Sequence, residues 1–370
     1  MDRKNVVLVA RDAAPSRAFS NLIPILQNMG FNVNLCAGDG KPLTRRAEEI
    51  ICAVEAADLV VLGMSSSEEL ATPEILAGKM ARDFGIPYGF YGDVRRCWAR
   101  ARAGAWFEDI ALHTAFYFGI TQADADAAHE VFPNASLYGT GNPLREEMAF
   151  TRFTREEVRV KLGVRPEQKL VLAPGGKFAA GNMAQWAVVM DALDLLNESG
   201  HYASGPSFQL ILSTHPGDRT PYAVDSATQK ELNLYEELVA LSPVPTRIVG
   251  KDAFTTSDIV PGADIIVEFG SSIGIEGAYQ NVPVISLGLE VLMRRLEQAS
   301  GSRVLEAVED GLSELVDYAN AEELAYQISK LLTPDGFARM SARQKELCPR
   351  PTERGAALRN IAHAIETIVA

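Results

Sequence analysis

Two serines and a glutamate follow a run of apolar residues near position 265, and their spacing is suited to binding an anion. The segment Ile265–Leu287 predicts a buried strand, a turn at Gly270, Ser271 and Ser272, and a helix that carries Glu276 about one turn in. Backbone N–H groups and hydroxyls at such a helix start can bind a phosphate, and a carboxylate one turn later can accept the hydroxyls of a ribose. The alternative is that the serines only cap the helix and that Glu276 is solvated.

Two further polar turns follow predicted strands in the same half of the chain. Gly175, Gly176 and Lys177 come after the strand predicted at 169–173, and consecutive glycines let the backbone approach a ligand closely. His215 follows the strand predicted at 208–214, and open α/β sheets place their sites at this carboxyl edge. Lys177 could neutralise a phosphate or be solvated. His215 is a candidate catalytic residue, with a purely structural role as the alternative.

The first half of the chain also has charged residues just after its predicted strands. Arg11 and Arg17 lie in the loop and first helical turn after the strand predicted at 4–10, where they could clamp a phosphate bidentately or simply be solvated. Asp93 ends another predicted strand and is a candidate general base, with a surface-turn aspartate as the alternative. Asn142 lies in a turn where glycines permit a sharp bend and Pro143 disfavours helix before it.

These turns need strands and helices to position them, and the hydrophobic pattern predicts both. Apolar runs alternate with segments of helical period, which predicts α/β domains with doubly wound parallel sheets. We expect a Rossmann-like domain over 1–143, a linker helix over 144–168 and a second Rossmann-like domain over 169–350. Thr154 and Glu157 have the spacing of a capping box at a helix start. The last helix, predicted at 354–370, is expected to cross back onto the first domain.

The composition is that of a globular protein, with 47% hydrophobic and 22% charged residues. A formal net charge of −13 opposes binding to nucleic acid, whereas a sugar diphosphate can still bind locally at helix N-termini. No apolar run approaches the roughly 20 residues of a membrane helix and no signal peptide opens the sequence, so we expect a cytoplasmic protein. The four cysteines show no C-x-x-C spacing, and we expect reduced thiols and no metal site.

The segment 265–287, which ends in Asn281-Val-Pro-Val-Ile-Ser286, resembles the nucleotide-binding half of the B-type glycosyltransferase fold. That superfamily includes the nucleotide-sugar glycosyltransferases and the non-hydrolysing UDP-N-acetylglucosamine 2-epimerases. Thr140-Gly-Asn-Pro143 is similar to a stretch that these enzymes carry between their domains, and the histidine followed by proline at 215 is similar to an epimerase motif.

The resemblance implies a fold and a ligand. It implies two Rossmann-like domains that face each other across a cleft, with a nucleotide-sugar bound between them. The Gly/Ser turn would hold the diphosphate and Glu276 the ribose. The base would be held through the backbone of the loop that contains Gly250 and Phe254.

The sequence also departs from the epimerase pattern, because the Gly-Asp-Thr and His-Val-Glu-Ala-Gly stretches that supply acidic residues around the sugar are not recognisable. We therefore expect a glycosyltransferase that uses a UDP-sugar, in polysaccharide or glycoconjugate biosynthesis, without a cofactor or a tightly held metal. A carboxylate of the first domain would deprotonate the acceptor hydroxyl, and the sequence does not identify the acceptor. A homodimer is compatible with the sequence. The alternatives are an epimerase-like isomerase or hydrolase and a non-catalytic sugar-nucleotide-binding protein.

Overall fold

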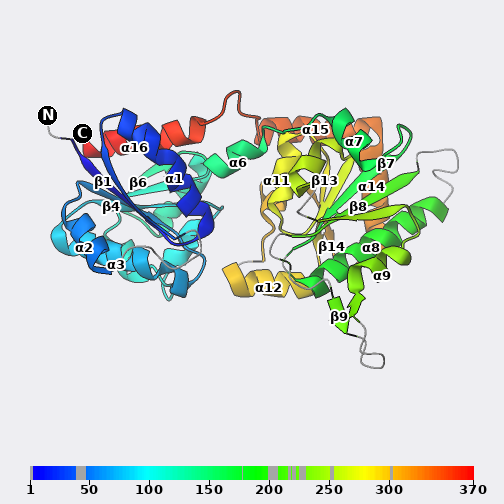
Figure 1. Ribbon diagram of the computed structural model, residues 1–370, viewed down its shortest axis with the longest axis horizontal. Coiled ribbons are helices and arrows are strands. Elements are labelled where there is room, and N and C mark those ends of the chain that lie inside the picture. The colour runs from blue at the N-terminus through cyan, green and yellow to red at the C-terminus, as the bar shows by residue number, and fades with distance from the viewer. Residues whose placement is uncertain are drawn as a thin grey trace. The chain divides into compact units, whose positions relative to one another are not determined.

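The computed structural model describes residues 3–38, 47–176, 178–198, 207–215, 218, 222–224, 231–250, 254–300 and 303–370. The chain forms two compact units, one comprising Met1–Glu147 with Pro351–Ala370 and the other Met148–Arg350. Each unit is built on one six-stranded parallel sheet with helices on both faces (Figure 1). The predicted α/β class with two doubly wound parallel sheets is confirmed.

The sheet of the first unit has the order β2-β1-β3-β4-β5-β6. Its strands are β1 Asn5–Ala10, β2 Asn32–Ala37, β3 Leu59–Gly63, β4 Tyr88–Tyr91, β5 Phe116–Gly119 and β6 Ser136–Gly139. Its helices are α1 Ala13–Asn28, α2 Ala47–Glu55, α3 Glu68–Phe84, α4 Glu108–Ala111, α5 Gln122–Ala127, α6 Pro143–Met148 and α16 Ala356–Val369. The strand order reverses between β1 and β3, and open sheets carry a crevice at such a switch point.

Alternate residues of β1 pack on opposite faces of this sheet, as the period of two in a strand requires. Val6 and Leu8 contact the core under α1 and α16, whereas Val7 and Val9 contact the core under α2 and α3. Figure 1 shows the two helix pairs on opposite sides of the sheet. Both faces are therefore apolar, which is why β1 is a continuous hydrophobic run.

Helix α16, at the end of the sequence, belongs to the first unit. Ile361 and Ile365 are buried in the same core as α1 and β1. Glu146 on α6 accepts the backbone N–H groups of Ala356 (3.0 Å) and Ala357 (2.6 Å), so a carboxylate caps the start of α16. The core of the first unit thus includes residues from both ends of the chain.

The sheet of the second unit has the order β11-β8-β7-β12-β13-β14. Its strands are β7 Lys169–Pro174, β8 Phe208–Ser213, β11 Thr246–Val249, β12 Ile265–Glu268, β13 Val284–Gly288 and β14 Glu314–Asp317, and a separate antiparallel pair is formed by β9 Tyr222–Val224 and β10 Glu231–Asn233. Its helices are α7 Arg155–Leu162, α8 Ala179–Glu198, α9 Leu234–Ala240, α10 Thr256–Ile259, α11 Ser272–Tyr279, α12 Glu290–Ser300, α13 Glu306–Glu309, α14 Ala321–Leu332 and α15 Pro334–Leu347. This strand order is that of dinucleotide-binding sheets, and its switch point lies between β7 and β12.

Strand β7 divides the core of the second unit in the same alternating way. Val171 and Ala173 pack with α8 and α14, and Leu170 and Leu172 pack with α7 and α11. Among the described residues, no helix is long and apolar enough to cross a membrane.

The segment 144–168 holds two helices, α6 and α7, instead of the single linker helix expected there. The predicted capping box at the start of α7 is confirmed: Thr154 accepts the backbone N–H of Glu157, and Glu157 accepts that of Thr154. The chain between the helices is fixed by Arg152, which makes a bidentate ion pair with Asp258. This new helix start and the ion pair explain why α6 does not continue into α7.

Candidate functional site

The candidate site of the second unit lies where β7 and β12 separate. The two strands pair at only two positions before they diverge. The buried amide of Gln185 on α8 bridges the opening, donating to the carbonyl oxygens of Pro174 (3.1 Å) and Val267 (3.0 Å). A side chain therefore fixes the width of the crevice where the ladder of backbone hydrogen bonds ends.

The glycine pair after β7 combines one tightly packed and one open position. A Cβ on Gly175 would lie 2.9 Å from the ring of Trp186 and 3.0 Å from Asn182, whereas a Cβ on Gly176 would meet nothing closer than 3.9 Å. Asn182 accepts the N–H of Gly176 (2.6 Å) and donates to its carbonyl (3.1 Å). Gly175 is thus required by packing, and Gly176 offers an exposed but firmly held backbone. Lys177 lies outside the described residues.

A buried polar network holds Asn182 in place. Its amide nitrogen is 3.1 Å from a carboxylate oxygen of Asp218 and 3.0 Å from the hydroxyl of Tyr235, which itself donates to Asp218 (2.6 Å). The Tyr235 ring packs edge-on against Trp186 at 4.8 Å. Because each of these polar groups has a partner, the turn is pre-organised for a ligand.

A pocket of about 540 Å³ opens beside this turn, within the usual size range of small-molecule sites. It lies between the start of α8, the end of β12 and α12, and is lined mainly by apolar side chains, among them Phe178, Phe269, Leu292 and Leu296. Arg295 on α12 also lines it, with its guanidinium 4.0 Å from the centre of the Phe178 ring. Within the described part of the chain this exposed arginine donates to no protein acceptor, so its donors are available to an anion.

The turn before α11 has the geometry that its sequence predicts. Gly270 has a φ of +54°, in the left-handed region that favours glycine. Ser271 caps the helix by accepting the N–H of Ile273 (3.3 Å). Ser272 is the exposed first helical residue, and its N–H meets no acceptor among the residues described. An anion can therefore reach the N–H and hydroxyl of Ser272.

Glu268, which the sequence analysis missed, lies beneath this turn. It is fully buried, accepting the N–H of Ser271 (2.6 Å) and the hydroxyl of Ser286, which lies 2.9 Å from the hydroxyl of Ser313. Burial raises the pKa of Glu268 to about 7. The N–H of Ser271 is consequently taken up by the protein, and a phosphate would depend on Ser272.

Glu276 is buried, which excludes the alternative of a solvated glutamate. It is only 2% exposed, and it accepts the hydroxyl of Ser257 on α10 (2.9 Å). Burial raises its pKa to about 7. This burial does not follow from the local pattern, because it depends on the glycine at 277, which packs against Ile266 and Val284 and lets α11 lie close to the sheet. Ser257 is exposed, so one hydroxyl separates the Glu276 carboxyl from the surface.

The remaining candidates of the second unit lie at the carboxyl ends of β8 and β11. His215 is half-buried, and its carbonyl accepts the N–H of Asp218 (2.9 Å). Gly250 is exposed directly after β11. The Phe254 ring is half-buried and packs against Phe153 at 5.3 Å. The parallel sheet thus brings His215 and Gly250 to the same edge as the glycine turns, while the ring of Phe254 is used in packing.

In the first unit, the structure brings Asp93 and Asn142 together. The amide of Asn142 donates to the backbone carbonyl of Asp93 (2.5 Å), and its side-chain oxygen accepts the N–H of Leu144 (2.8 Å) at the start of α6. Asn142 is 8% exposed. Its side chain therefore joins the end of β4 to α6, and both ends of its amide group are occupied by the protein.

The carboxylate of Asp93 is nearly buried and lies beside an arginine. Its side chain is 11% exposed, and burial raises its pKa, while Arg100 at 3.9 Å opposes this shift. The Cys97 thiol lies 3.6 Å away. Arg100, another residue that the sequence analysis missed, also donates to the carbonyl of Met64. A carboxylate that is poised by burial and oriented by a fixed cation can accept a proton from a hydroxyl.

The two arginines of the first unit differ. Arg11 is held against α3, donating to the carbonyl of Glu69 (2.8 Å), with its guanidinium 3.8 Å from that residue's carboxylate. Its backbone N–H is donated to buried Glu74 (3.2 Å), whose pKa burial raises to about 7. Arg17 is exposed on α1 and has no protein partner in the ranges that the structure describes. Of the predicted pair, Arg17 alone has all of its guanidinium donors available.

Metal ligands do not cluster in this structure: the described residues contain no group of three or more His, Cys, Asp or Glu side chains arranged to hold a metal ion. The groups that the candidate residues of the two units do offer are backbone N–H groups, hydroxyls, arginines and carboxylates.

Comparison with sequences finds no relative, since no family model and no curated protein matches the chain. Comparison with solved structures finds proteins of similar fold. A proposed UDP-N-acetylglucosamine 2-epimerase from Listeria monocytogenes is 14% identical and has a TM-score of 0.63, with 99% of this chain and 97% of that chain covered. A glycosyltransferase from Rickettsia africae is 15% identical with a TM-score of 0.61, covering 100% of this chain and 99% of that chain.

A UDP-GlcNAc 2-epimerase from Neisseria meningitidis, solved with UDP-GlcNAc bound, is 13% identical with a TM-score of 0.58, and the match covers 98% of this chain and 100% of that chain. These structures all have the B-type glycosyltransferase fold. The two parallel α/β units, together with matches that cover 98% to 100% of this chain at TM-scores of 0.58 to 0.63, show that this chain has that fold too.

Proposed function

We propose that the protein is a glycosyltransferase that takes its sugar from a UDP-linked donor. The observation that carries the proposal is the pocket at the switch point of the second sheet, whose lining includes Arg295, an arginine that donates to no acceptor among the described residues. Helix α11 begins after β12 at the same edge of the sheet, with the N–H of Ser272 open to an anion. This combination can bind a diphosphate by backbone N–H, hydroxyl and guanidinium groups without a metal. Similarity to a glycosyltransferase and to epimerases of UDP-GlcNAc supports the choice of donor.

Each group has a role in this proposal. Ser272 and Arg295 bind the diphosphate, and the exposed backbone of Gly176 contacts the sugar in the 540 Å³ pocket. A ribose hydroxyl displaces the hydroxyl of Ser257 and donates to the carboxyl of Glu276 in its place. In the first unit, Asp93 accepts the proton of the acceptor hydroxyl.

The first test is a thermal-shift panel with UDP, CDP, GDP and TDP. A ligand that binds only the folded state stabilises it by about 2.7 kcal/mol at a hundred times its Kd, so saturating UDP is expected to raise the melting temperature measurably. The other three nucleotides serve as controls for the base. If none of the four changes the melting temperature at millimolar concentration, the chain has no nucleotide site of this kind.

A second candidate function is a 2-epimerase or hydrolase of UDP-N-acetylglucosamine, which is favoured by similarity to epimerase structures over nearly the whole chain. Incubation with UDP-N-acetylglucosamine alone separates it from a transferase. A 2-epimerase produces the manno isomer, a hydrolase releases free sugar at a rate that does not need an acceptor, and a strict transferase does neither. Asp93→Asn is the matched inactive control, since it keeps the size of the side chain while removing the base.

A further inference from the structure

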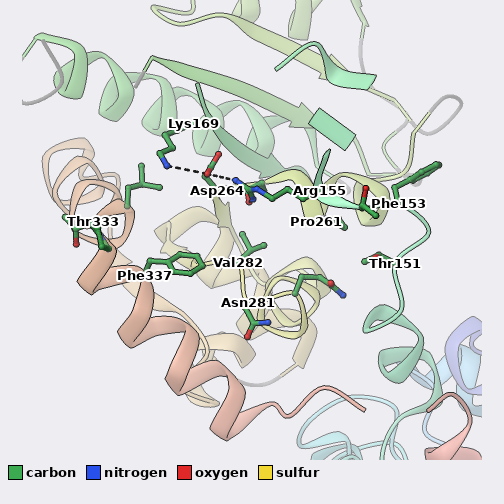
Figure 2. A pocket seen from close by; sticks show the side chains of 15 residues that line it. Thr151, Phe153, Arg155, Lys169, Pro261, Asp264, Asn281, Val282, Thr333 and Phe337 are labelled. Atoms are coloured by element: carbon green, nitrogen blue, oxygen red, sulfur yellow. Dashed lines mark hydrogen bonds and ion pairs between the residues drawn. The ribbon is translucent and has the colours of Figure 1, made fainter. Parts of the chain in front are cut away.

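A second pocket, of about 620 Å³, lies in the second unit at the amino ends of its strands (Figure 2). Lys169 begins β7, and Asp264 directly precedes β12. The six residues of β7 separate this edge from the glycine turn by about 20 Å, at 3.3 Å per residue. The pocket is therefore distinct from the candidate donor site at the carboxyl edge.

Positive charge outnumbers negative charge beside this pocket. Asp264 is its sole acidic lining residue among those described, with a side chain 9% exposed. Its carboxylate accepts from Arg155 (2.7 Å) and Arg159 (2.9 Å), and the ammonium of Lys169 lies 3.6 Å away. Three cations thus surround one carboxylate, which leaves two positive charges uncompensated in a protein whose formal net charge is −13.

The donors that remain available belong to Arg155 and Lys169, which both line the pocket. Arg159 is committed to structure, because it also donates to the carbonyls of Gly262 (3.3 Å), Arg165 (3.1 Å) and Gln168 (2.7 Å). Arg155 donates once to Asp264 and once to a backbone carbonyl, so it retains three of its five N–H donors. The Lys169 side chain is 35% exposed and retains donors as well.

Apolar side chains, two of them aromatic, also line the pocket, beside the polar residues Gln280, Asn281 and Thr333. Phe337 on α15 points toward Val282 in Figure 2, and Phe153 lies at the other end of the pocket. The Phe337 side chain is 45% exposed although no function described so far requires it. The pocket therefore combines apolar surface with two cations, Arg155 and Lys169, that retain donors beyond their contacts with Asp264.

We propose that this pocket binds a small phosphomonoester with an aromatic or apolar body. A phosphomonoester carries a charge of about −1.5 to −2 at neutral pH, which matches the two uncompensated cations, and arginine binds phosphate oxygens bidentately. A monocarboxylate would neutralise only one of them. The volume, about 620 Å³, is in the range of small-molecule sites and accommodates a ring between Phe153 and Phe337.

Phenyl phosphate, titrated calorimetrically into the full chain, is the probe that tests this proposal. We expect saturable binding, competition by inorganic phosphate and no binding of benzyl alcohol. Arg155→Gln should weaken the binding by about ten- to a hundredfold, as expected for the loss of a charge-assisted hydrogen bond, and Arg155→Gln with Lys169→Gln should abolish it. Lys345→Gln, an exposed change on α15 outside the pocket, is the matched control and should bind as the parent does.

Phe337→Glu provides a variant that leaves the ion pairs of Asp264 intact and adds a negative charge at an exposed position. It should abolish phenyl phosphate binding while the circular dichroism spectrum stays that of the parent. The proposal is overturned if the parent does not bind phenyl phosphate at millimolar concentration, or if Phe337→Glu or the double variant binds it with the parent's affinity. Binding that benzyl alcohol reproduces would also overturn it, because the cations would then have no part in recognition.

Discussion

Replacing Glu268 by glutamine should make the protein more stable at alkaline pH. Glu268 is completely buried beneath the α11 turn, and its pKa is raised from 4.5 to about 7. Between these values the folded protein binds the proton and the unfolded chain does not, so the free energy of unfolding falls as the pH rises. The difference between 4.5 and about 7, at about 1.36 kcal/mol per pKa unit, corresponds to roughly 3 kcal/mol, of which roughly 2 to 3 kcal/mol is lost between pH 5 and pH 8.

Glutamine is neutral throughout this range and suits the same hydrogen bonds. Its carbonyl oxygen can accept the N–H of Ser271, and its amide can donate to the hydroxyl of Ser286, which then donates to Ser313. The variant should therefore lose roughly 2 to 3 kcal/mol less stability than the parent between pH 5 and pH 8. Glu74 and Glu276, whose pKa values are also about 7, titrate in both proteins and cancel in the comparison.

Scanning calorimetry at several pH values between 5 and 8 measures the effect and resolves the two units if they unfold separately. Glu346→Gln, an exposed change on α15, is the matched control and should follow the parent at every pH. Parallel pH profiles for Glu268→Gln and the parent would refute the reasoning, because they would show that the buried carboxyl ionises as easily in the folded state as in the unfolded chain.

Three further substitutions test the site at the carboxyl edge of the second sheet. Gly175→Ala should destabilise the protein by about 1–3 kcal/mol in urea unfolding, because its Cβ would lie 2.9 Å from Trp186. Gly176→Ala, whose Cβ would lie 3.9 Å from its nearest neighbour, should cost less than about 1 kcal/mol, and equal costs would contradict the packing argument. Glu276→Ala should weaken UDP binding about ten- to a hundredfold in calorimetric titration, while Ser257→Ala should bind UDP within about twofold of the parent. An unchanged UDP affinity in Glu276→Ala would mean that this carboxyl serves only the protein core. Arg295→Gln should weaken UDP binding by a similar factor, whereas Arg294→Gln, which removes an exposed ion pair with Glu290, should leave the UDP affinity unchanged. If the two variants have the same UDP affinity, the arginine over Phe178 does not bind phosphate.

Most of the fold could be predicted from the sequence because parallel strands buried on both faces are continuous apolar runs. The strands predicted at 4–10 and 169–173 lie within one residue of the observed bounds of β1 and β7. Helix α3 shows a limit of such patterns: proline favours a first helical turn, yet Pro73 lies inside α3, which starts at Glu68 because Ser67 caps it by accepting the N–H of Leu70. Proline was a weaker indication of the start than the serine followed by two glutamates.

The site was only partly predictable, for a different reason. Glycines and serines in turns follow from local geometry, so Gly175, Gly270 and Ser271 were found from the sequence. The residues that support these turns, such as Gln185 and Asn182 on α8, are ordinary polar residues in a helix until the fold buries them against strand ends. Glu268 did carry an indication, since an acidic residue that ends a run of buried apolar residues must find donors or change its pKa.

The packing of α16 against β1 and α1 determines when, during synthesis of the chain, the core of the first unit can be completed. The second unit is one uninterrupted stretch, Met148–Arg350, and all of it is synthesised before α16 exists. At about 5–20 residues per second, synthesis of these roughly 200 residues takes on the order of ten to forty seconds, during which β1 and α1 lack the helix that covers Val6 and Leu8. The unit that contains β1 and α1 can therefore complete its core only after the whole of the other unit has been synthesised, and until then the apolar face of its sheet lacks α16.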